Sequence, residues 1–176
     1  MENKNMEEPI IFQVREPEAP ESLDSAQDVY RYFEQYTKAA QEMFFVVYLN
    51  AKNTPIKTIR HTTGTFNSAA VYPQEIIKTA LYLGASSLIL AHNHPSGDPA
   101  PSSSDTEITK QIVYASKFFE IKVLDHVIIG NGKAGEPLYS YESAGYIETF
   151  ERNFQDFVIN AEIGRNPQKT SPAFSF

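Results

Sequence analysis

Hydrophobic and polar positions follow two different periods along the chain, and each period predicts a different kind of element. Runs rich in β-branched and aromatic residues predict strands, whereas apolar residues three or four apart predict helices. The expected strands are residues 43–49, 56–62, 87–91, 121–129 and 138–141, with a short leading strand at 10–14. The expected helices are residues 25–38, 73–83 with Gly84 as a stop, a segment carrying Ile108, Ile112, Ala115 and Phe119, and a segment from about Ile147.

The order of these elements, β-α-β-β-α-β-α-β-β, mixes hairpins with helical crossovers. It favours an α/β fold in which helices flank a mixed β-sheet. We expect an N-terminal extension over residues 1–24, one domain over 25–146, and a C-terminal helix and tail over 147–176. The apolar positions of that last helix have helical spacing, and docking on the chain's own domain is favoured over docking on a partner. They are Phe150, Phe154, Phe157 and Val158.

Composition narrows the classes of protein to consider. The chain has 176 residues, 41% of them hydrophobic, which is enough for one packed domain. The net charge is -7, and no Lys/Arg cluster is stronger than the scattered Arg165 and Lys169. Because phosphate neutralisation dominates nucleic-acid affinity, direct binding to DNA or RNA is disfavoured. The composition specifies no oligomeric state.

The absence of cysteine excludes disulfides, thiolate metal sites and cysteine nucleophiles. Residues 1–9 are acidic and polar, and no apolar run approaches membrane-spanning length. We therefore expect a cytoplasmic protein that does not associate with membranes.

The candidate chemistry lies where an apolar run ends in His92 and His94. Side chains two apart on a strand point the same way, so two imidazoles would project side by side. Asp105 can supply a third ligand and leave a fourth position open for water, as in catalytic zinc sites. The chain is thus a candidate metal-dependent hydrolase.

Each part of this pattern also has an ordinary structural interpretation. Two histidines near a strand end can be polar loop residues, and Ser102 with Asp105 has the S-x-x-D spacing of a helix cap. Asp98 is expected to be a turn residue. The joint pattern favours a metal site, because every ordinary interpretation would have to hold independently. The letters HNH at residues 92–94 do not indicate an HNH nuclease, in which these residues are spread over a ββα unit.

The spacing H-x-H-x(7)-S-x-x-D, from His92 to Asp105, resembles the JAB/MPN metalloprotease motif, often called JAMM. The surrounding AHNHPSGD at residues 91–98 is similar to the signature of the bacterial RadC family. The segments VYPQE at 71–75 and VLDHVIIG at 123–130 resemble that family as well, so the likeness covers about residues 25 to 145.

The resemblance implies a JAB/MPN, cytidine-deaminase-like architecture with one Zn²⁺ per chain. It assigns the metal ligands to His92, His94 and Asp105, and the oxyanion donor to Ser102. The family's upstream glutamate, which acts on the zinc-bound water, maps to Glu42. By composition Glu75 and Glu107 are rivals for that role, but both fall at expected helix starts, where acidic residues favour the helix dipole.

Two other histidines are weighed separately. His126 lies within a hydrophobic strand, where a histidine that packs in the core or orients a ligand through its other nitrogen is favoured over a direct ligand. His61 has no partner pattern and receives no role. The loop at 62–71 can border a substrate groove, but its sequence does not indicate which substrate is preferred.

Two classes of function follow. The first is a zinc metallopeptidase of JAMM type that hydrolyses a peptide or isopeptide amide bond in a peptide or protein substrate. The second is a non-catalytic JAB-like interaction module or DNA-repair accessory protein. RadC-like proteins commonly carry an N-terminal helix-hairpin-helix region, which we expect to be lacking here because fewer than 25 residues precede the first helix. This weakens the link to DNA repair. A zinc nucleobase deaminase is set aside, because its P-C-x-x-C motif needs cysteine.

Overall fold

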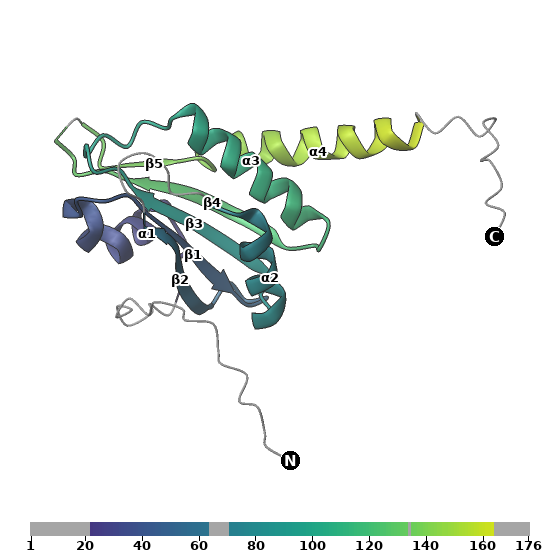
Figure 1. Cartoon of the computed structure of the whole chain (residues 1–176), viewed down its shortest axis with the longest axis horizontal. Helices are drawn as coiled ribbons and strands as arrows, with labels where there is room; N and C mark the ends of the chain where they lie inside the picture. The colour runs from purple at the N-terminus through teal and green to yellow at the C-terminus, as the bar shows by residue number, and fades with distance from the viewer. Residues whose placement is uncertain (1–21, 64–70, 134, 164–176) are drawn as a thin grey trace, which may run out of the picture.

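A mixed five-stranded sheet forms the centre of the molecule in the computed structural model, which describes residues 22–63, 71–133 and 135–163 (Figure 1). The strands lie in the order β2-β1-β3-β4-β5. Their bounds are β1 Met43–Leu49, β2 Pro55–Thr63, β3 Ser87–Asn93, β4 Lys122–Ile129 and β5 Leu138–Ser140. Strand β3 pairs antiparallel with β1 and parallel with β4, so the mixed α/β class predicted from the element order is confirmed.

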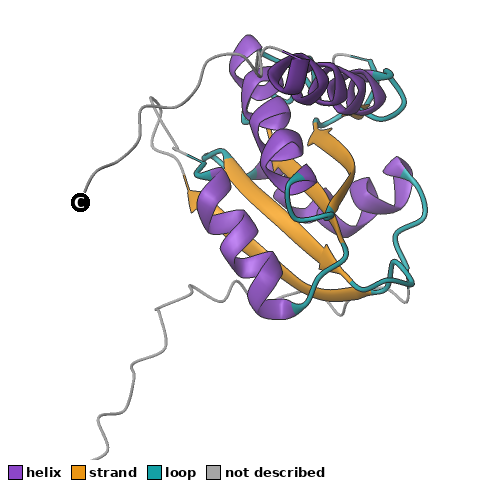
Figure 2. Ribbon diagram, turned by 90° about the vertical axis from the view of Figure 1, so that its right-hand side faces the viewer, coloured by secondary structure: helices purple, strands orange, loops and turns teal. Residues whose placement is uncertain are grey.

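Helices cover both faces of this sheet (Figure 2). Their bounds are α1 Ala26–Phe33, the 3₁₀-helix η1 Glu34–Lys38, α2 Pro73–Leu83, α3 Ser103–Lys117 and α4 Tyr146–Ile163. One core packs α2, α3 and α4 against one face, and α1 with η1 packs against the other. None of the helices in the described ranges is both long and apolar enough to cross a bilayer.

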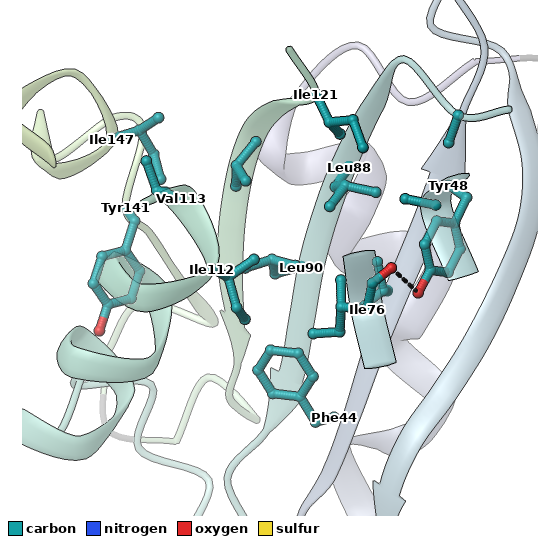
Figure 3. Packing of buried hydrophobic residues seen from close by; sticks show 14 of the residues in the cluster. Phe44, Tyr48, Ile76, Leu88, Leu90, Ile112, Val113, Ile121, Tyr141 and Ile147 are labelled. Carbon is teal, nitrogen blue, oxygen red and sulfur yellow. Dashed lines mark hydrogen bonds between the residues drawn. The ribbon is translucent and has the colours of Figure 1, made fainter. Parts of the chain in front are cut away.

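Side chains of the central strands point alternately to the two faces of the sheet, so the same strands contribute to both cores. In β1, Phe44, Val46 and Tyr48 face the α2–α3 side, while the residues between them face α1. Strand β3 is buried along its whole length, which is why its sequence is a continuous apolar run rather than an alternating one. Figure 3 shows Phe44, Leu90 and Ile112 meeting in the larger core.

A β-bulge in β4 sets which side chains of that strand face α3. The register with β3 shifts between Leu88 and Ile89, so that Val123 pairs with Leu88 and Asp125 with Ile89. Val123 and Ile128 are five residues apart, yet both belong to the larger core. A regular strand would place them on opposite faces, so the bulge turns His126 towards the face that α3 covers.

The parallel β3–α3–β4 unit determines where β3 and α3 meet. Because α3 must return the chain for a parallel partner, the N-terminus of α3 lies beside the C-terminal end of β3. This geometry brings Asp105, in the first turn of α3, back to the end of the strand that carries His92.

Four details differ from the sequence-based expectations or lie beyond them. The first helix changes to 3₁₀ geometry after Phe33, and β3 continues to Asn93 rather than ending at residue 91. Phe119 was placed on the apolar face of the third helix, which is wrong: α3 ends at Lys117, and Phe119 is 51% exposed. The strand expected at 10–14 lies outside the described residues.

The C-terminal helix docks on the chain's own domain through two of the four expected apolar positions. Phe150 and Phe154 are buried, and the ring of Phe154 packs edge-on against Tyr114 and Phe118 with centroids 5.4 and 4.9 Å away. Lys117 Nζ lies 2.8 Å from Glu151 Oε1, and this ion pair also joins α3 to α4. Val158 is half-buried, and the side chain of the fourth position, residue 157, lies outside the description.

Candidate metal centre

His92 lies within β3 and is 1% exposed, deeper than a residue at a strand end would be. Its Cα is paired with Phe44 on one side and Ile128 on the other, and its ring stacks on Phe44 at 6.0 Å between centroids. The backbone ladder on both sides holds this imidazole rigidly in one place.

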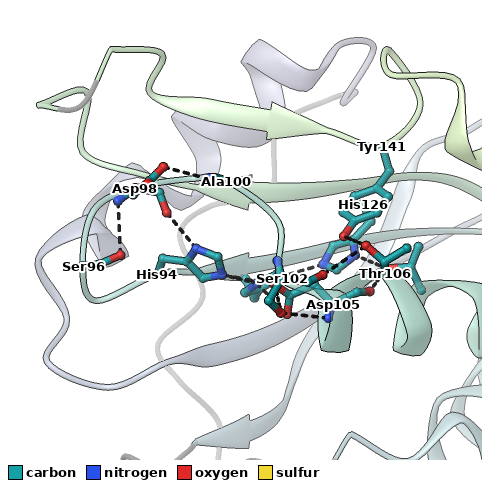
Figure 4. A network of polar contacts seen from close by, with 11 residues as sticks. His94, Ser96, Asp98, Ala100, Ser102, Asp105, Thr106, His126 and Tyr141 are labelled. Atoms are coloured by element: carbon teal, nitrogen blue, oxygen red, sulfur yellow. Dashed lines mark hydrogen bonds and ion pairs between the residues drawn. The ribbon is translucent and has the colours of Figure 1, made fainter.

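His94 follows β3 directly, and its ring is oriented by the loop that comes after it. The Nδ1 atom lies 2.7 Å from the carbonyl oxygen of Asp98, which can only accept a hydrogen bond (Figure 4). The proton of a neutral ring is therefore on Nδ1, and the lone pair of Nε2 points away from the loop. Asp98 belongs to this turn, as expected, and its backbone rather than its carboxylate serves the site.

Gly97 allows that loop to close against the end of β4. Its φ is 81°, and its carbonyl accepts a 3.0 Å hydrogen bond from the backbone N–H of Asn131. A Cβ at this position would overlap the side-chain amide of Asn131. A glycine is needed here both for the backbone conformation and for the close approach.

Asp105 comes from the first turn of α3, where it forms a capping box with Ser102. Its Oδ2 accepts from the backbone N–H of Ser102 at 2.8 Å and from the Ser102 hydroxyl at 2.6 Å, and its own N–H donates to that hydroxyl oxygen. The carboxylate also lies 3.5 Å from the Nε2 atoms of His92 and His94. The cap thus aims the carboxylate at the imidazoles.

These three residues converge on one point. One ligand atom from each lies within 4.8 Å of the other two, and the two Nε2 atoms are 3.0 Å apart. Without a metal, a hydrogen on one of the two Nε2 atoms can bridge them at this distance; with a metal bound, both lone pairs are available to the ion. Two imidazole nitrogens and one carboxylate oxygen are the donor set of catalytic zinc sites, which keep a fourth position open. The residues therefore fit a single divalent metal ion.

The ionisation of the cluster reflects this crowding. Burial lowers the pKa of His92 to about 4, which keeps its ring neutral. Burial also disfavours the charged form of His94, but the hydrogen bond and negative charge of Asp105 outweigh it and raise the His94 pKa. Burial likewise opposes ionisation of Asp105, yet its bonds to His94 and Ser102 and the proximity of His92 hold its pKa well below the ordinary range. Asp105 is thus an anion facing two rings, one of them readily protonated.

Glu42 precedes β1 directly and faces the same cluster. Partial burial and then the negative charge of Asp105 raise its pKa, whereas His94 lowers it. A carboxyl group with a raised pKa beside a metal site is suited to taking up and releasing a proton. The rival glutamates are not part of the cluster: Glu75 pairs with Lys78 on α2, and Glu107 pairs with Lys110 on α3.

Asn93, between the two histidines, holds Glu42 in place, a role that the sequence analysis missed. Its Oδ1 accepts from the N–H of Met43 at 2.9 Å, and its Nδ2 donates to the carbonyl of Gln41 at 3.1 Å. Since it lies between two residues that share one face, its opposite orientation was the signal that could have revealed it.

His126 contacts a ligand residue rather than the metal position itself. Its Nε2 lies 2.8 Å from His92 Nδ1, and its Nδ1 lies 2.6 Å from the hydroxyl of Thr109. The ring is fully buried, and Tyr141 stacks on it at 5.1 Å between centroids. Burial, followed by the proximity of His92, keeps its pKa well below the ordinary value. The sequence analysis missed Thr109, although it stands one helical turn after Asp105.

The remaining candidates lie apart from the cluster or are undescribed. His61 bonds Tyr48 through a 2.6 Å contact between Nε2 and the phenol oxygen. Of the loop at 62–71, residues 64–70 lie outside the described ranges.

Comparison with known proteins gives a consistent family. The model of the RadC-like JAB domain family matches residues 23–146. A UPF0758 protein of Actinobacillus succinogenes is 53% identical over 92 residues, which cover 52% of this chain and 42% of the relative. One of Caldanaerobacter subterraneus is 44% identical over 128 residues, 72% of this chain and 53% of the relative. A UPF0758 protein of Bacillus cereus is 45% identical over 113 residues, which cover 64% of this chain and 50% of the relative.

The chain spans about half the length of the curated relatives it matches. Their names state no activity, so they identify the domain and leave its chemistry to the site. The family match covers more than half of the residues, and it contains the whole histidine–aspartate cluster. The chain therefore belongs to the RadC-like JAB domain family.

Proposed function

We propose that this domain is a zinc-dependent hydrolase of JAMM type that cleaves a peptide or isopeptide amide bond. The observation that carries the proposal is the convergence of His92, His94 and Asp105 within 4.8 Å. Glu42 is half-buried, and its pKa is raised by burial and by the negative charge of Asp105. The donor set is that of catalytic zinc, and the carboxyl group beside it can work as a general base.

Zinc held by these three residues would lower the pKa of a water molecule towards ~7 and polarise the substrate carbonyl. The side chains of the protein orient the reacting groups and transfer the protons. Glu42 takes the proton of the attacking water and delivers it to the leaving nitrogen, for which a raised pKa is suited because the carboxyl group must both gain and lose that proton.

Ser102 has two tasks that compete for one hydroxyl hydrogen. In this structure the hydrogen goes to Asp105 Oδ2 at 2.6 Å, as the helix-cap interpretation requires. To stabilise the oxyanion, the Ser102 hydroxyl turns from Asp105 towards the substrate, while the backbone N–H of Ser102 keeps its own 2.8 Å bond to that carboxylate. One such donor contributes about 3 kcal/mol to the transition state.

Metal content and turnover separate the roles of the ligands from that of the base. His94→Ala removes a ligand, so purified protein should contain no stoichiometric zinc, whereas Glu42→Gln should keep one zinc per chain and lose turnover. Glu75→Gln, a carboxyl-to-amide change on α2 away from the cluster, is the matched control and should keep both. Full zinc occupancy in His94→Ala would contradict the ligand assignment.

The substrate class is tested by a screen of peptide and isopeptide-linked libraries, with and without a chelator. Cleavage that the chelator abolishes and zinc restores supports the hydrolase. Binding of a partner without cleavage, in protein that carries a full complement of zinc, would instead indicate a non-catalytic interaction module or a DNA-repair accessory protein.

A further inference from the structure

We propose that Thr109 and His126 form a hydrogen-bond relay, running from the backbone of Asp105 to His92, that fixes the tautomer in which His92 can bind a metal. The inference rests on the proposed metal site and names two positioning residues that the ligand motif does not contain. The relay links the third ligand residue to the first through the interior of the domain.

The relay begins at an atom that can only accept. The Thr109 hydroxyl oxygen lies 2.5 Å from the carbonyl oxygen of Asp105, one helical turn earlier. A carbonyl oxygen carries no hydrogen, so the single hydroxyl hydrogen of Thr109 points to it. The same hydroxyl lies 2.6 Å from His126 Nδ1, and with its hydrogen already engaged it must accept there. His126 Nδ1 therefore carries a hydrogen.

The next step passes through the ring of His126. This ring is fully buried between Phe44 and Tyr141, where a charged imidazolium would lose its hydration, so the ring is neutral. A neutral ring with its hydrogen on Nδ1 has a lone pair on Nε2. His92 Nδ1, 2.8 Å away, then donates to that lone pair.

The last step leaves His92 ready to bind a metal. With its hydrogen on Nδ1, a neutral His92 presents the lone pair of Nε2 to Asp105 and His94. The opposite tautomer of His126 would place a hydrogen on its Nε2, force His92 Nδ1 to accept, and put a hydrogen on the atom that must hold the metal. His94 reaches the same state by a shorter route, through the carbonyl of Asp98.

Tertiary structure supports the relay at each point. The β4 bulge turns His126 towards α3, and the parallel arrangement of β3 and β4 sets it opposite Leu90, beside His92 on the neighbouring strand. Thr109 is fully buried, so water does not compete for its hydroxyl. Partners that orient a metal-binding histidine through its second nitrogen commonly change metal affinity 10- to 100-fold when removed.

The tautomers can be observed directly in metal-free protein by long-range ¹H–¹⁵N NMR correlation of the imidazole rings. We expect His92 and His126 both to carry their hydrogen on Nδ1 in the unmutated chain. A hydrogen on Nε2 of His126 would overturn the proposal. Because this measurement uses neither zinc nor substrate, it stands apart from the proposed hydrolysis: failure to bind zinc would contradict the proposed function, and the tautomers would still decide the relay.

Zinc affinity, measured by competition with a chromophoric chelator, tests the consequence. Thr109→Val removes the hydroxyl at nearly constant volume and should weaken zinc binding about 10- to 100-fold. Thr109→Ser restores the hydroxyl and should return affinity to within about threefold of the unmutated chain, a rescue that follows from the relay and not from the methyl packing of threonine.

The matched control is Thr149→Val on α4. Thr149 makes the same kind of bond to the carbonyl four residues earlier, at 2.8 Å to Gly145, and contacts neither histidine. The Thr149→Val variant should bind zinc as tightly as the unmutated chain does. The relay is overturned if Thr109→Val binds zinc within about twofold of the unmutated chain, or if Thr109→Ser is as weak as Thr109→Val. Should Thr109→Val fail to fold, the NMR assignment and Thr109→Ser still decide the proposal.

Discussion

The side-chain amide of Asn93 bonds the backbone on both sides of Glu42, accepting from Met43 and donating to Gln41. The β1–β3 ladder ends at the pair Phe44–His92, and the Asn93 side chain continues the pairing by one more residue. The strand that presents the metal ligands thus also holds the proposed base, so the two are positioned by a single rigid element.

Asn93→Ala should therefore separate metal binding from turnover. We expect one zinc per chain to remain, because His92 and His94 keep their backbone positions, and turnover to fall about 10- to 100-fold because the base is misplaced. Loss of two partly buried hydrogen bonds should lower the free energy of unfolding by about 1–3 kcal/mol. Zinc content, kcat and urea denaturation measure these effects.

Asn50→Ala is the matched control for that variant. Asn50 Oδ1 also accepts two backbone N–H groups, those of Lys52 and Thr54, but in the β1–β2 turn. It should lower stability and leave kcat unchanged. An Asn93→Ala protein with unchanged kcat would show that Glu42 does not depend on this clamp.

Gly97→Ala should damage both stability and zinc binding. Alanine at φ 81° is strained by about 1–2 kcal/mol, and its Cβ would overlap the side chain of Asn131, so that side chain or the loop must shift. A shift of the strained loop withdraws the Asp98 carbonyl from His94, and we expect zinc affinity to fall at least about tenfold. Gly84→Ala, at φ 64° with nothing within 4 Å of the added Cβ, should show the strain alone and bind zinc normally. Chelator competition and denaturant midpoints distinguish the two.

Phe154→Ala tests the docking of α4. Its ring is 9% exposed and packs against Tyr114 and Phe118, so its loss should reduce the free energy of unfolding by about 3 kcal/mol. Phe119→Ala makes the same change at a ring that is 51% exposed and should alter stability by less than about 0.5 kcal/mol. A Phe154→Ala change that lowers stability no more than about 0.5 kcal/mol would contradict the docking of this ring on α3.

His61 should make the metal-free protein sensitive to acid. Burial lowers its pKa to about 4, with the charge of Glu75 opposing in part, whereas in the unfolded chain it titrates near ~6.5. Between these values the unfolded state binds more protons, so stability falls as the pH drops from ~6.5 towards 4. His61→Gln, which keeps a polar partner for Tyr48, should reduce that slope by up to about 1 kcal/mol per pH unit. Urea denaturation at pH 5 and pH 7 in chelator measures the slope, and an unchanged slope would contradict the assignment.

Much of the architecture could be predicted because it depends on local patterns. The run from Met43 to Leu49 and the helix from Pro73 to Gly84 carry their periods and end signals in adjacent residues, and both agree with the structure. The histidine pair could be predicted for the same reason, since i and i+2 on a strand share a face whatever surrounds them.

Errors and omissions arose where a contact crosses between distant segments. Apolar spacing extended the third helix to Phe119, but the chain turns after Lys117 to enter β4. Thr109 could be placed on the same helical face as Asp105, yet its partner His126 comes from β4. The orientation of His126 depends on a bulge that the sequence of β4 does not indicate.

By itself, the sequence determined the alternating pattern of strands and helices, the pair of imidazoles at the end of β3, and the acid three residues after Ser102, because these follow from spacing along one chain. Only the tertiary structure decided that Glu42 faces them, that Asn93 clamps it, and that Thr109 and His126 reach His92. Those contacts depend on strand register and helix placement, which are set by packing among residues far apart in the sequence.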